Sequence, residues 1–122
     1  MKYVYGFEKL QVWIESKELT KNIYKITQKF PENEKFGLIS QLRRASISVC
    51  SNIAEGVSRN THKDKARFMI IAFSSAVEVV NQLIISHELD FITQKQYQDL
   101  RKQLESITNK LNALRKYQIS NQ

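Results

Sequence analysis

Apolar residues recur at helical spacing in four successive segments of this 122-residue chain. In the first segment, steps of four and three connect Val12, Ser16, Leu19, Ile23, Ile26 and Phe30. This spacing places one stripe along a helix. Because the residue before a proline avoids the α region, Phe30 followed by Pro31 marks an end. The pattern predicts an amphipathic helix over about residues 8–30.

A second stripe follows Pro31 and Asn33. Its members are Leu38, Leu42, Ala45, Val49, Ile53 and Val57. Gly56 and the polar residues 58–60 indicate where the helix ends. We therefore expect a second helix over about residues 34–58.

The third and fourth segments each open with a capping-box pattern, Thr61 with Asp64 and Thr93 with Gln96. In the third, over about residues 62–89, apolar residues between Phe68 and Ile85 occupy nearly every azimuth, so this helix must be covered on more than one side. The fourth, over about residues 94–117, repeats apolar residues at steps of 3, 4, 3, 4 and 3, which is a heptad seam. The seam consists of Tyr97, Leu100, Leu104, Ile107, Leu111 and Leu114. We expect residues 118–122 to fray.

The connections between these segments are only a few residues long, which makes consecutive helices antiparallel neighbours. Three glycines and one proline leave few turn formers for a fold of many short strands. The sequence predicts an all-α fold, an up-down-up-down antiparallel four-helix bundle that forms a single domain over residues 1–122.

The apolar surface exceeds what four buried stripes require. The third segment has residues left over, and the second has an additional apolar flank at Ile47 and Ala54, beside Arg43. Since large exposed apolar patches usually mark interfaces, we expect a homo-oligomer. The alternative is that the third helix simply lies centrally in a compact monomer.

Polar residues of the second segment and one acid of the third are candidates for charge pairing or for the oligomer contact. Glu78 is the only acid in the apolar-rich stretch 68–83, where an uncompensated charge is costly. We predict that Arg43 or Arg44 pairs with it, within the chain or across an interface. Alternatively, Glu78 lies on a wet edge with Asn81 and Gln82. The full candidate set is Arg43, Arg44, Ile47, Asn52, Ala54, Glu55 and Glu78.

The chain is basic, with 19 Lys and Arg against 12 Asp and Glu, a net charge of +7, so polyanions are plausible partners. The densest basic runs lie around the turn between the second and third helices and on the fourth helix. They comprise Arg59, Lys63, Lys65, Arg67, Arg101, Lys102, Lys110, Arg115 and Lys116. We interpret them as candidate phosphate contacts that do not read base sequence. Solvated charge is the alternative, and most aromatic residues fall at core spacings rather than where they could stack on bases.

No catalytic constellation is recognisable. His62 and His87 lie near helix ends without a partner nucleophile, and their spacing to acids matches no metal motif. Cys50, the only cysteine, is interpreted as a small core residue. The chain has no glycine-rich phosphate loop, and its longest apolar run, residues 68–73, is too short to span a membrane. We expect a non-enzymatic protein of the cytoplasm without metal, cofactor or membrane partner.

Several motifs resemble one known family. They are FEKLQVW at residues 7–13, FGL at 36–38, QLRRA at 41–45 and SNIAEG at 51–56. In these the chain is similar to the bacterial four-helix-bundle proteins encoded in 23S ribosomal RNA intervening sequences, and the likeness extends over about residues 7–92. Ser46 and Cys50 depart from it, since the family tends to have proline or small aliphatic residues there.

The resemblance implies a left-handed up-down bundle that assembles into a homopentameric ring with a central channel. It also implies kinship with the accessory variability protein of diversity-generating retroelements, a similar basic pentamer that works with a reverse transcriptase and nucleic acid. No biochemical activity is established for most family members. The positive charge and this kinship make nucleic acid, RNA or DNA, the first expected partner besides the chain itself. The alternative is a scaffold that binds a protein partner.

Overall fold

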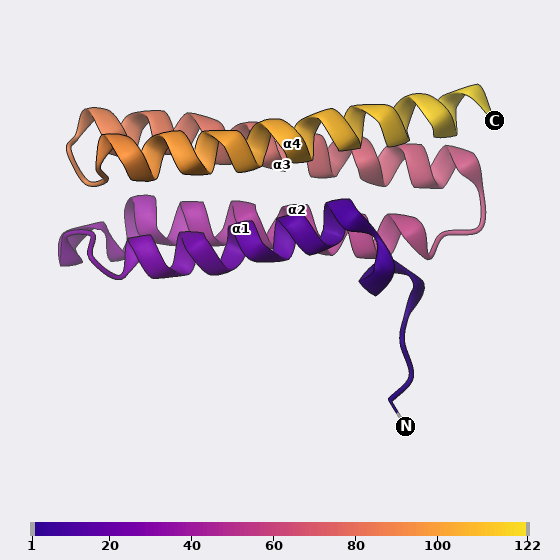
Figure 1. The fold of residues 1–122 in the computed structure, drawn as a ribbon, viewed down its shortest axis with the longest axis horizontal. Coiled ribbons are helices and arrows are strands. Elements are labelled where there is room, and N and C mark those ends of the chain that lie inside the picture. The colour runs from indigo at the N-terminus through magenta and orange to yellow at the C-terminus, as the bar shows by residue number, and fades with distance from the viewer. Residues whose placement is uncertain (1, 122) are drawn as a thin grey trace.

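A computed structural model describes residues 2–121, which form four long α-helices and no β-strand. The helices are α1 (Gln11–Thr27), α2 (Ser40–Val57), α3 (His62–Glu88) and α4 (Gln94–Ser120). Short turns of other helix types precede α1 and α2, namely η1 (Gly6–Lys9), η2 (Glu32–Glu34) and η3 (Lys35–Ile39). The four long helices lie side by side along the long axis (Figure 1). The all-helical prediction is therefore confirmed.

Each long helix packs against two others. α1 contacts α2 and α4, and α3 contacts the same two helices. The α1–α2 and α3–α4 connections lie at one end of this four-helix bundle (Figure 1). The α2–α3 connection lies at the other end, together with the N-terminal segment and the end of α4. Segments far apart in sequence thus meet at that second end.

The predicted stripes form the core. Its fully buried members include Leu19, Ile23, Leu42, Val49, Ile53, Leu83, Leu104, Ile107 and Leu111. Ser16, a polar member of the first stripe, is also buried, and its hydroxyl donates to the Val12 carbonyl at 2.7 Å. That bond satisfies the hydroxyl without a partner from another helix. Cys50, which we placed in the core, is half-buried at its edge.

The first helix is shorter than predicted at both ends. The Glu8 carboxylate accepts from the Tyr5 amide at 2.8 Å and closes the separate turn η1. Leu10 then has an extended backbone (φ −81°, ψ 124°), so α1 begins only at Gln11. At the other end α1 stops at Thr27, although Phe30 remains buried. At the C-terminal end the apolar spacing continued from Ile26 to Phe30 and concealed the break. At the N-terminal end the stripe begins only at Val12 and did not mark where the helix starts.

The second helix also begins later than predicted. Gly37 has a non-helical backbone (φ −106°, ψ −116°), and the Glu34 carboxylate caps this bend by accepting from the Leu38 amide at 3.1 Å. Residues 32–39 therefore form η2 and η3, and α2 starts at Ser40.

The helix starts predicted from capping patterns are confirmed for α3 and α4. Thr61 accepts from the Asp64 amide at 3.1 Å, which is one half of the predicted capping box. The Asp64 carboxylate instead pairs with Arg67, whose Nε lies 3.8 Å away. Thr93 and Gln96 form the complete box. α4 continues to Ser120, so residues 118–120 are helical and not frayed as expected. Gln118 is held there by a hydrogen bond to the His62 ring.

α2 ends at Val57, within one residue of the predicted end, and Gly56 lies in its last turn. The residue is buried, and a Cβ added to it would lie 2.7 Å from Phe68 Cβ and 2.5 Å from Met69 Cε. Glycine here allows α2 and α3 to approach closely.

α3 is covered on two sides, by α2 and α4, as its all-round apolar pattern predicted. Of the helices in residues 2–121, it is the one long and apolar enough to cross a membrane by length and composition. Core helices of soluble bundles have the same properties, and the inner face of α3 is occupied by neighbouring helices.

Candidate nucleic-acid interface

Glu78 on α3 pairs with Arg44 on α2, as predicted. Arg44 Nη2 lies 2.8 Å from Glu78 Oε2, and the same nitrogen donates to the Gln41 side chain at 3.0 Å. The two side chains are 58% and 45% exposed, so the pair lies in solvent and not in the core. Glu78 therefore both pairs with an arginine and lies on a solvent-exposed edge, so the two alternatives hold together. Asn81 shares this exposed edge, whereas Gln82 is buried.

Arg43 binds in the other direction, to α1. Its Nε donates to the Thr27 hydroxyl at 3.0 Å, and its guanidinium lies 4.5 Å from the centre of the Tyr24 ring. Arg43 is thus a tie between α2 and the end of α1 and is not a partner for Glu78.

The remaining candidate residues of α2 have different surroundings. Asn52 donates to the Ser48 carbonyl at 2.8 Å, and the Ser48 and Ser75 hydroxyls are bonded at 2.8 Å across α2 and α3. Glu55 and Ile47 are exposed, and Ala54 is half-buried. Only Ile47 therefore presents substantial apolar surface from the flank we singled out.

Most of the surplus apolar surface belongs to α3. Ile70, Ile71, Val77 and Ile85 are each about two-fifths to one-half exposed. At 100° per residue they lie within one broad outward face of the helix. At the same spacing Glu78 falls within this face, between Ile85 and Ile71, and pairs there with Arg44 of α2.

The first basic group lies at the end of the bundle where α2 connects to α3. Arg59 and Arg67 both stack on the buried Phe68 ring, with guanidinium carbons 4.6 and 4.8 Å from the ring centre. Contact with a fixed ring restricts both arginine side chains, while 59% of the Arg67 side chain stays exposed. Lys63 is exposed and Lys65 half-buried on the same first turns of α3.

The end of α4 joins this group. The His62 ring is bonded to the Gln118 side chain and meets the Tyr117 ring edge-on, with centres 6.2 Å apart. Lys116 is exposed beside this contact, and Arg115 is half-buried and donates to Asn112 at 3.3 Å. The structure therefore brings together six of the nine predicted basic residues. We call this set the basic end; it consists of Arg59, Lys63, Lys65, Arg67, Arg115 and Lys116.

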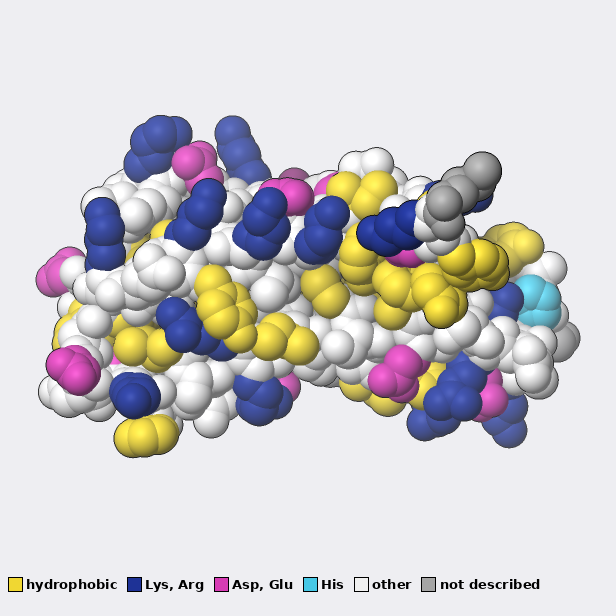
Figure 2. Space-filling model, turned by 90° about the horizontal axis from the view of Figure 1, so that it is seen from below, with side chains coloured by type: hydrophobic (Ala, Val, Ile, Leu, Met, Phe, Trp, Pro, Cys, Tyr) yellow, Lys and Arg dark blue, Asp and Glu magenta, His cyan; other side chains and the backbone are white. Residues whose placement is uncertain are grey.

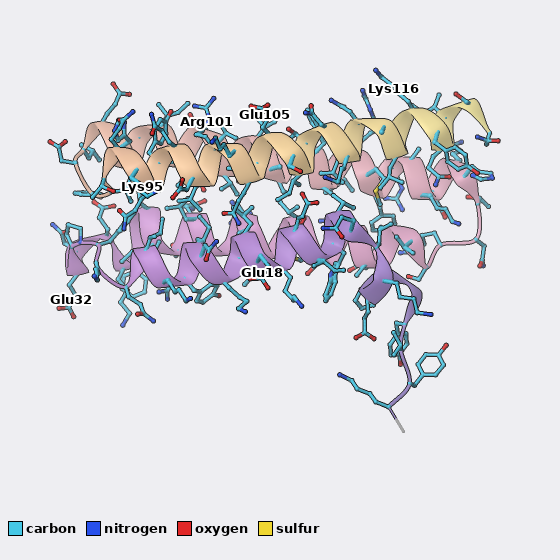
Figure 3. All side chains as sticks on the ribbon, in the orientation of Figure 1. Glu18, Glu32, Lys95, Arg101, Glu105 and Lys116 are labelled. Atoms are coloured by element: carbon cyan, nitrogen blue, oxygen red, sulfur yellow. The ribbon has the colours of Figure 1, made fainter. Side chains whose placement is uncertain are left out.

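The other three predicted basic residues lie elsewhere on α4. Figure 3 shows Arg101 and Lys116 toward opposite ends of the helix, and fifteen residues correspond to about 22 Å. Arg101 donates to the Tyr97 hydroxyl at 2.6 Å, and Tyr97 stacks on His87 with ring centres 4.3 Å apart. Arg101 and the exposed Lys102 line an open groove of about 820 Å³, which Asp99 and Glu105 also line. Its charge is mixed.

Lys110 is engaged inside the chain and differs from the other candidates. Its ammonium lies 2.9 Å from Glu15 Oε2 and donates to Ser106 at 2.8 Å. Burial raises the pKa of Glu15, but hydrogen bonds from Ser106, Lys110 and Gln11 and the Lys110 charge lower it more, so the pKa lies below its ordinary value. Lys110 is therefore already neutralised by a partner within the fold.

The two histidines contact amide and aromatic side chains. His62 contacts Gln118 and Tyr117, and His87 stacks on Tyr97. Within residues 2–121, no group of three or more His, Cys, Asp or Glu side chains could hold a metal ion.

Comparison with known proteins identifies the family. The sequence profile of the 23S rRNA-intervening sequence protein family matches residues 8–113. The chain belongs to this family.

One solved structure of similar fold is a protein of unknown function from the S23 ribosomal protein family of Bacteroides thetaiotaomicron VPI-5482. It is 25% identical, with a TM-score of 0.78 over 86% of this chain and 98% of that one. A search of curated proteins found no match. The family assignment confirms the resemblance read from the sequence motifs.

Two of the motifs that indicated the 23S rRNA-intervening sequence protein family include packing contacts between elements. Phe7 of η1 meets Trp13 of α1 edge-on, with ring centres 5.0 Å apart. The motif SNIAEG contains both Asn52, which bonds back to Ser48, and Gly56, where α2 approaches α3. These motif positions are explained by packing.

Sequence reasoning missed a set of exposed aromatic residues in this family member. Tyr3 and Tyr5 are 74% and 59% exposed on the segment before η1, and Tyr117 is exposed at the basic end. They were overlooked because we assigned most aromatic residues to core spacings. Two tyrosines at alternate positions ahead of the first helix, in a lysine-containing stretch, were the available signal.

Proposed function

We propose that this protein is a non-enzymatic homo-oligomer that binds RNA or DNA in the cytoplasm through basic faces, without reading base sequence. The observation that supports the proposal best is the basic end, where six cations of the α2–α3 connection, the start of α3 and the end of α4 lie at the same end of the bundle. Stacking on Phe68 and the half-burial of Arg115 hold part of this set in place. Restricted cations lose less side-chain entropy on meeting phosphates.

The quaternary part of the proposal is an up-down-up-down bundle that assembles as a pentamer, as the family resemblance implies. The exposed apolar face of α3 supports self-association, because monomers rarely leave such a surface uncovered. Five chains at +7 each would repeat the basic end around the assembly. Light scattering at moderate salt tests this part, and a monomer would contradict it.

Binding is tested by titrating labelled RNA and DNA at several salt concentrations. We expect log Kd to rise with log salt, because phosphate contacts release counterions. Replacing Lys63 and Lys116 by alanine should reduce the slope by about 0.7–0.9 for each lost contact. Lys95→Ala is the matched control, since Lys95 is exposed, lies at the opposite end of α4 and pairs with Asp99 at 3.2 Å. No binding at low salt would overturn the proposal.

A second function is a protein-interaction scaffold or accessory subunit without nucleic-acid contact. The α3 face favours it, since an apolar helix face suits a protein partner as well as another copy of the chain. Under this alternative the charge serves solubility and steers encounter. Copurification of one protein in fixed ratio, without nucleic-acid absorbance, would support this function over the first.

A further inference from the structure

Three aromatic rings of the segment before α1 and one ring of α1 form a continuous row. Tyr3 meets Tyr5 with ring centres 4.9 Å apart, and Tyr5 stacks on Phe7 at 6.1 Å. Phe7 meets Trp13 on α1 at 5.0 Å. The N-terminal segment extends away from the bundle (Figure 1).

The fold holds this row in position. The Tyr5 amide donates to the Glu8 carboxylate, and the Glu8 amide donates to the Tyr5 carbonyl at 3.1 Å, so η1 fixes Tyr5 relative to Phe7. Trp13 anchors the other end of the row on α1. Tyr3 and Tyr5 nevertheless keep most of their surface in solvent.

Lysines continue where the rings end. Lys17 Nζ lies 5.3 Å from the centre of the Trp13 ring. Lys21 and Lys25 follow at four-residue steps, each about 6 Å along α1, and Lys29 lies just beyond the end of the helix at Thr27. Figure 2 shows Lys and Arg side chains in a row along this face, leading to exposed hydrophobic side chains near the N-terminal segment.

Proteins that bind single-stranded nucleic acid combine exposed aromatic rings with a line of positive charge. Unpaired bases stack on aromatic side chains, while the backbone follows the positive charge. A duplex keeps its bases stacked on one another and offers no free base to these rings. Glu18 is partly neutralised by Lys21, 3.6 Å away, and Glu8 is bonded to the Tyr5 amide.

We propose that Tyr3 and Tyr5 form a base-stacking platform for single-stranded RNA or DNA, and that the lysine row of α1 carries its phosphates. The inference rests on the proposed nucleic-acid function and adds a second site, distinct from the basic end, with a preference for unpaired strands.

The test compares full-length protein with the variant Tyr3→Ala/Tyr5→Ala. The probes are a fluorescent oligouridylate, an oligo(dT) and a blunt duplex of equal length. We expect the variant to bind both single strands at least about fivefold more weakly, the lower value for losing one stacked base, and the duplex less than about twofold more weakly. Tyr3→Phe/Tyr5→Phe should restore single-strand binding, because the ring is retained. In wild type, 2-aminopurine placed in the single strand should be quenched.

Phe36→Ala is the matched control. Phe36 is the most exposed aromatic residue described, at 87%, and has a lysine nitrogen 5.7 Å from its ring centre, but it lies in η3 at the opposite end of the bundle. Its removal should leave single-strand affinity unchanged. An equal loss in this control would show a general aromatic effect and overturn the platform.

The outcomes separate the two proposals. Wild type that binds neither strand form overturns the nucleic-acid function and the platform with it. Binding that is unaffected by Tyr3→Ala/Tyr5→Ala, or lost equally for duplex, overturns only the platform. A variant that instead changes the oligomer size in light scattering shows that the segment docks on another copy of the chain, which also overturns it.

Discussion

The α2–α3 contact is formed by small residues that pack closely, whereas the α1–α4 contact is bridged by long polar side chains. Between α2 and α3, Gly56 lies directly against Phe68, and Ser48 bonds Ser75 through two short side chains. Between α1 and α4, longer side chains reach across, as in Asn22 to Gln103 at 3.2 Å and Glu15 to Lys110 at 2.9 Å. A cavity of about 230 Å³ opens beside the α1–α4 contact, lined in part by Asn22 and Gln103.

This difference separates two sources of stability. Close approach depends on small residues and tolerates no added volume, because packed interiors cannot absorb extra atoms without strain. A contact bridged by polar side chains depends on charge and hydrogen bonding, which pH and salt alter. Substitutions should therefore affect the two contacts in different ways.

The largest expected effect is from Gly56→Ala. The added Cβ would lie 2.7 Å from Phe68 Cβ and force α2 and α3 apart. We expect a net loss of about 1–2 kcal/mol in the free energy of unfolding, after the better helix propensity of alanine offsets part of the strain. Urea denaturation measures it.

Gly6→Ala is the control for that substitution, because nothing lies within 4 Å of a Cβ at Gly6. A Gly56→Ala protein as stable as wild type would show that the α2–α3 contact is not volume-limited.

An intermediate effect is expected for the ion pair between α1 and α4. A double-mutant cycle of Glu15→Gln and Lys110→Met should give a coupling of roughly 0.5–1 kcal/mol, discounted because the side chains are 23% and 41% exposed. The folded-state pKa of Glu15 is lowered, so its contribution is present at neutral pH. It is lost as pH falls below the ordinary glutamate value of about 4.3 and through the folded pKa.

Urea denaturation at several pH values checks this prediction. Wild type should lose more stability than Glu15→Gln between neutral and acidic pH. Glu18→Gln serves as the control, since Glu18 and its partner Lys21 are about half exposed or more. Identical acid profiles for Glu15→Gln and wild type would refute the pairing.

The smallest expected effect is for the ion pair across α2 and α3. Arg44 and Glu78 are both about half exposed, so a cycle of Arg44→Met and Glu78→Gln should give a coupling of at most about 0.5 kcal/mol, reduced further by salt. A coupling above that of Glu15 with Lys110 would show that charge, and not close packing, dominates this contact.

The core and the order of helices could be predicted because buried helix positions appear in the sequence as apolar residues at helical spacing. Leu42, Val49 and Ile53 are buried where the stripe put them. The breaks at Leu10 and Gly37 could not be predicted, since both residues precede the first member of their stripe and only the backbone reveals the turn.

For the candidate site, residue type limited what could be predicted. A cation partner for Glu78 followed from the cost of an unpaired acid, but choosing Arg44 over Arg43 required the directions of both side chains. The engagement of Lys110 depends on Glu15, 95 residues earlier in the chain, and no local pattern relates them. The exposure of Tyr3 and Tyr5 was missed because helical spacing does not distinguish a projecting segment from a buried one, and only their alternate positions in a lysine-containing stretch indicated it.

The half-buried Cys50 has a practical consequence. Its sulfur lies 3.5 Å from the Thr20 hydroxyl, between α2 and α1. Burial raises the pKa of the Cys50 thiol, with partial opposition from Thr20 and the Lys17 charge, so little thiolate forms at neutral pH. Thiol-reactive dyes will modify the native chain slowly, at a rate set by how often α1 and α2 separate locally. The rate at which Cys50 is modified therefore reports local opening of the contact between α1 and α2.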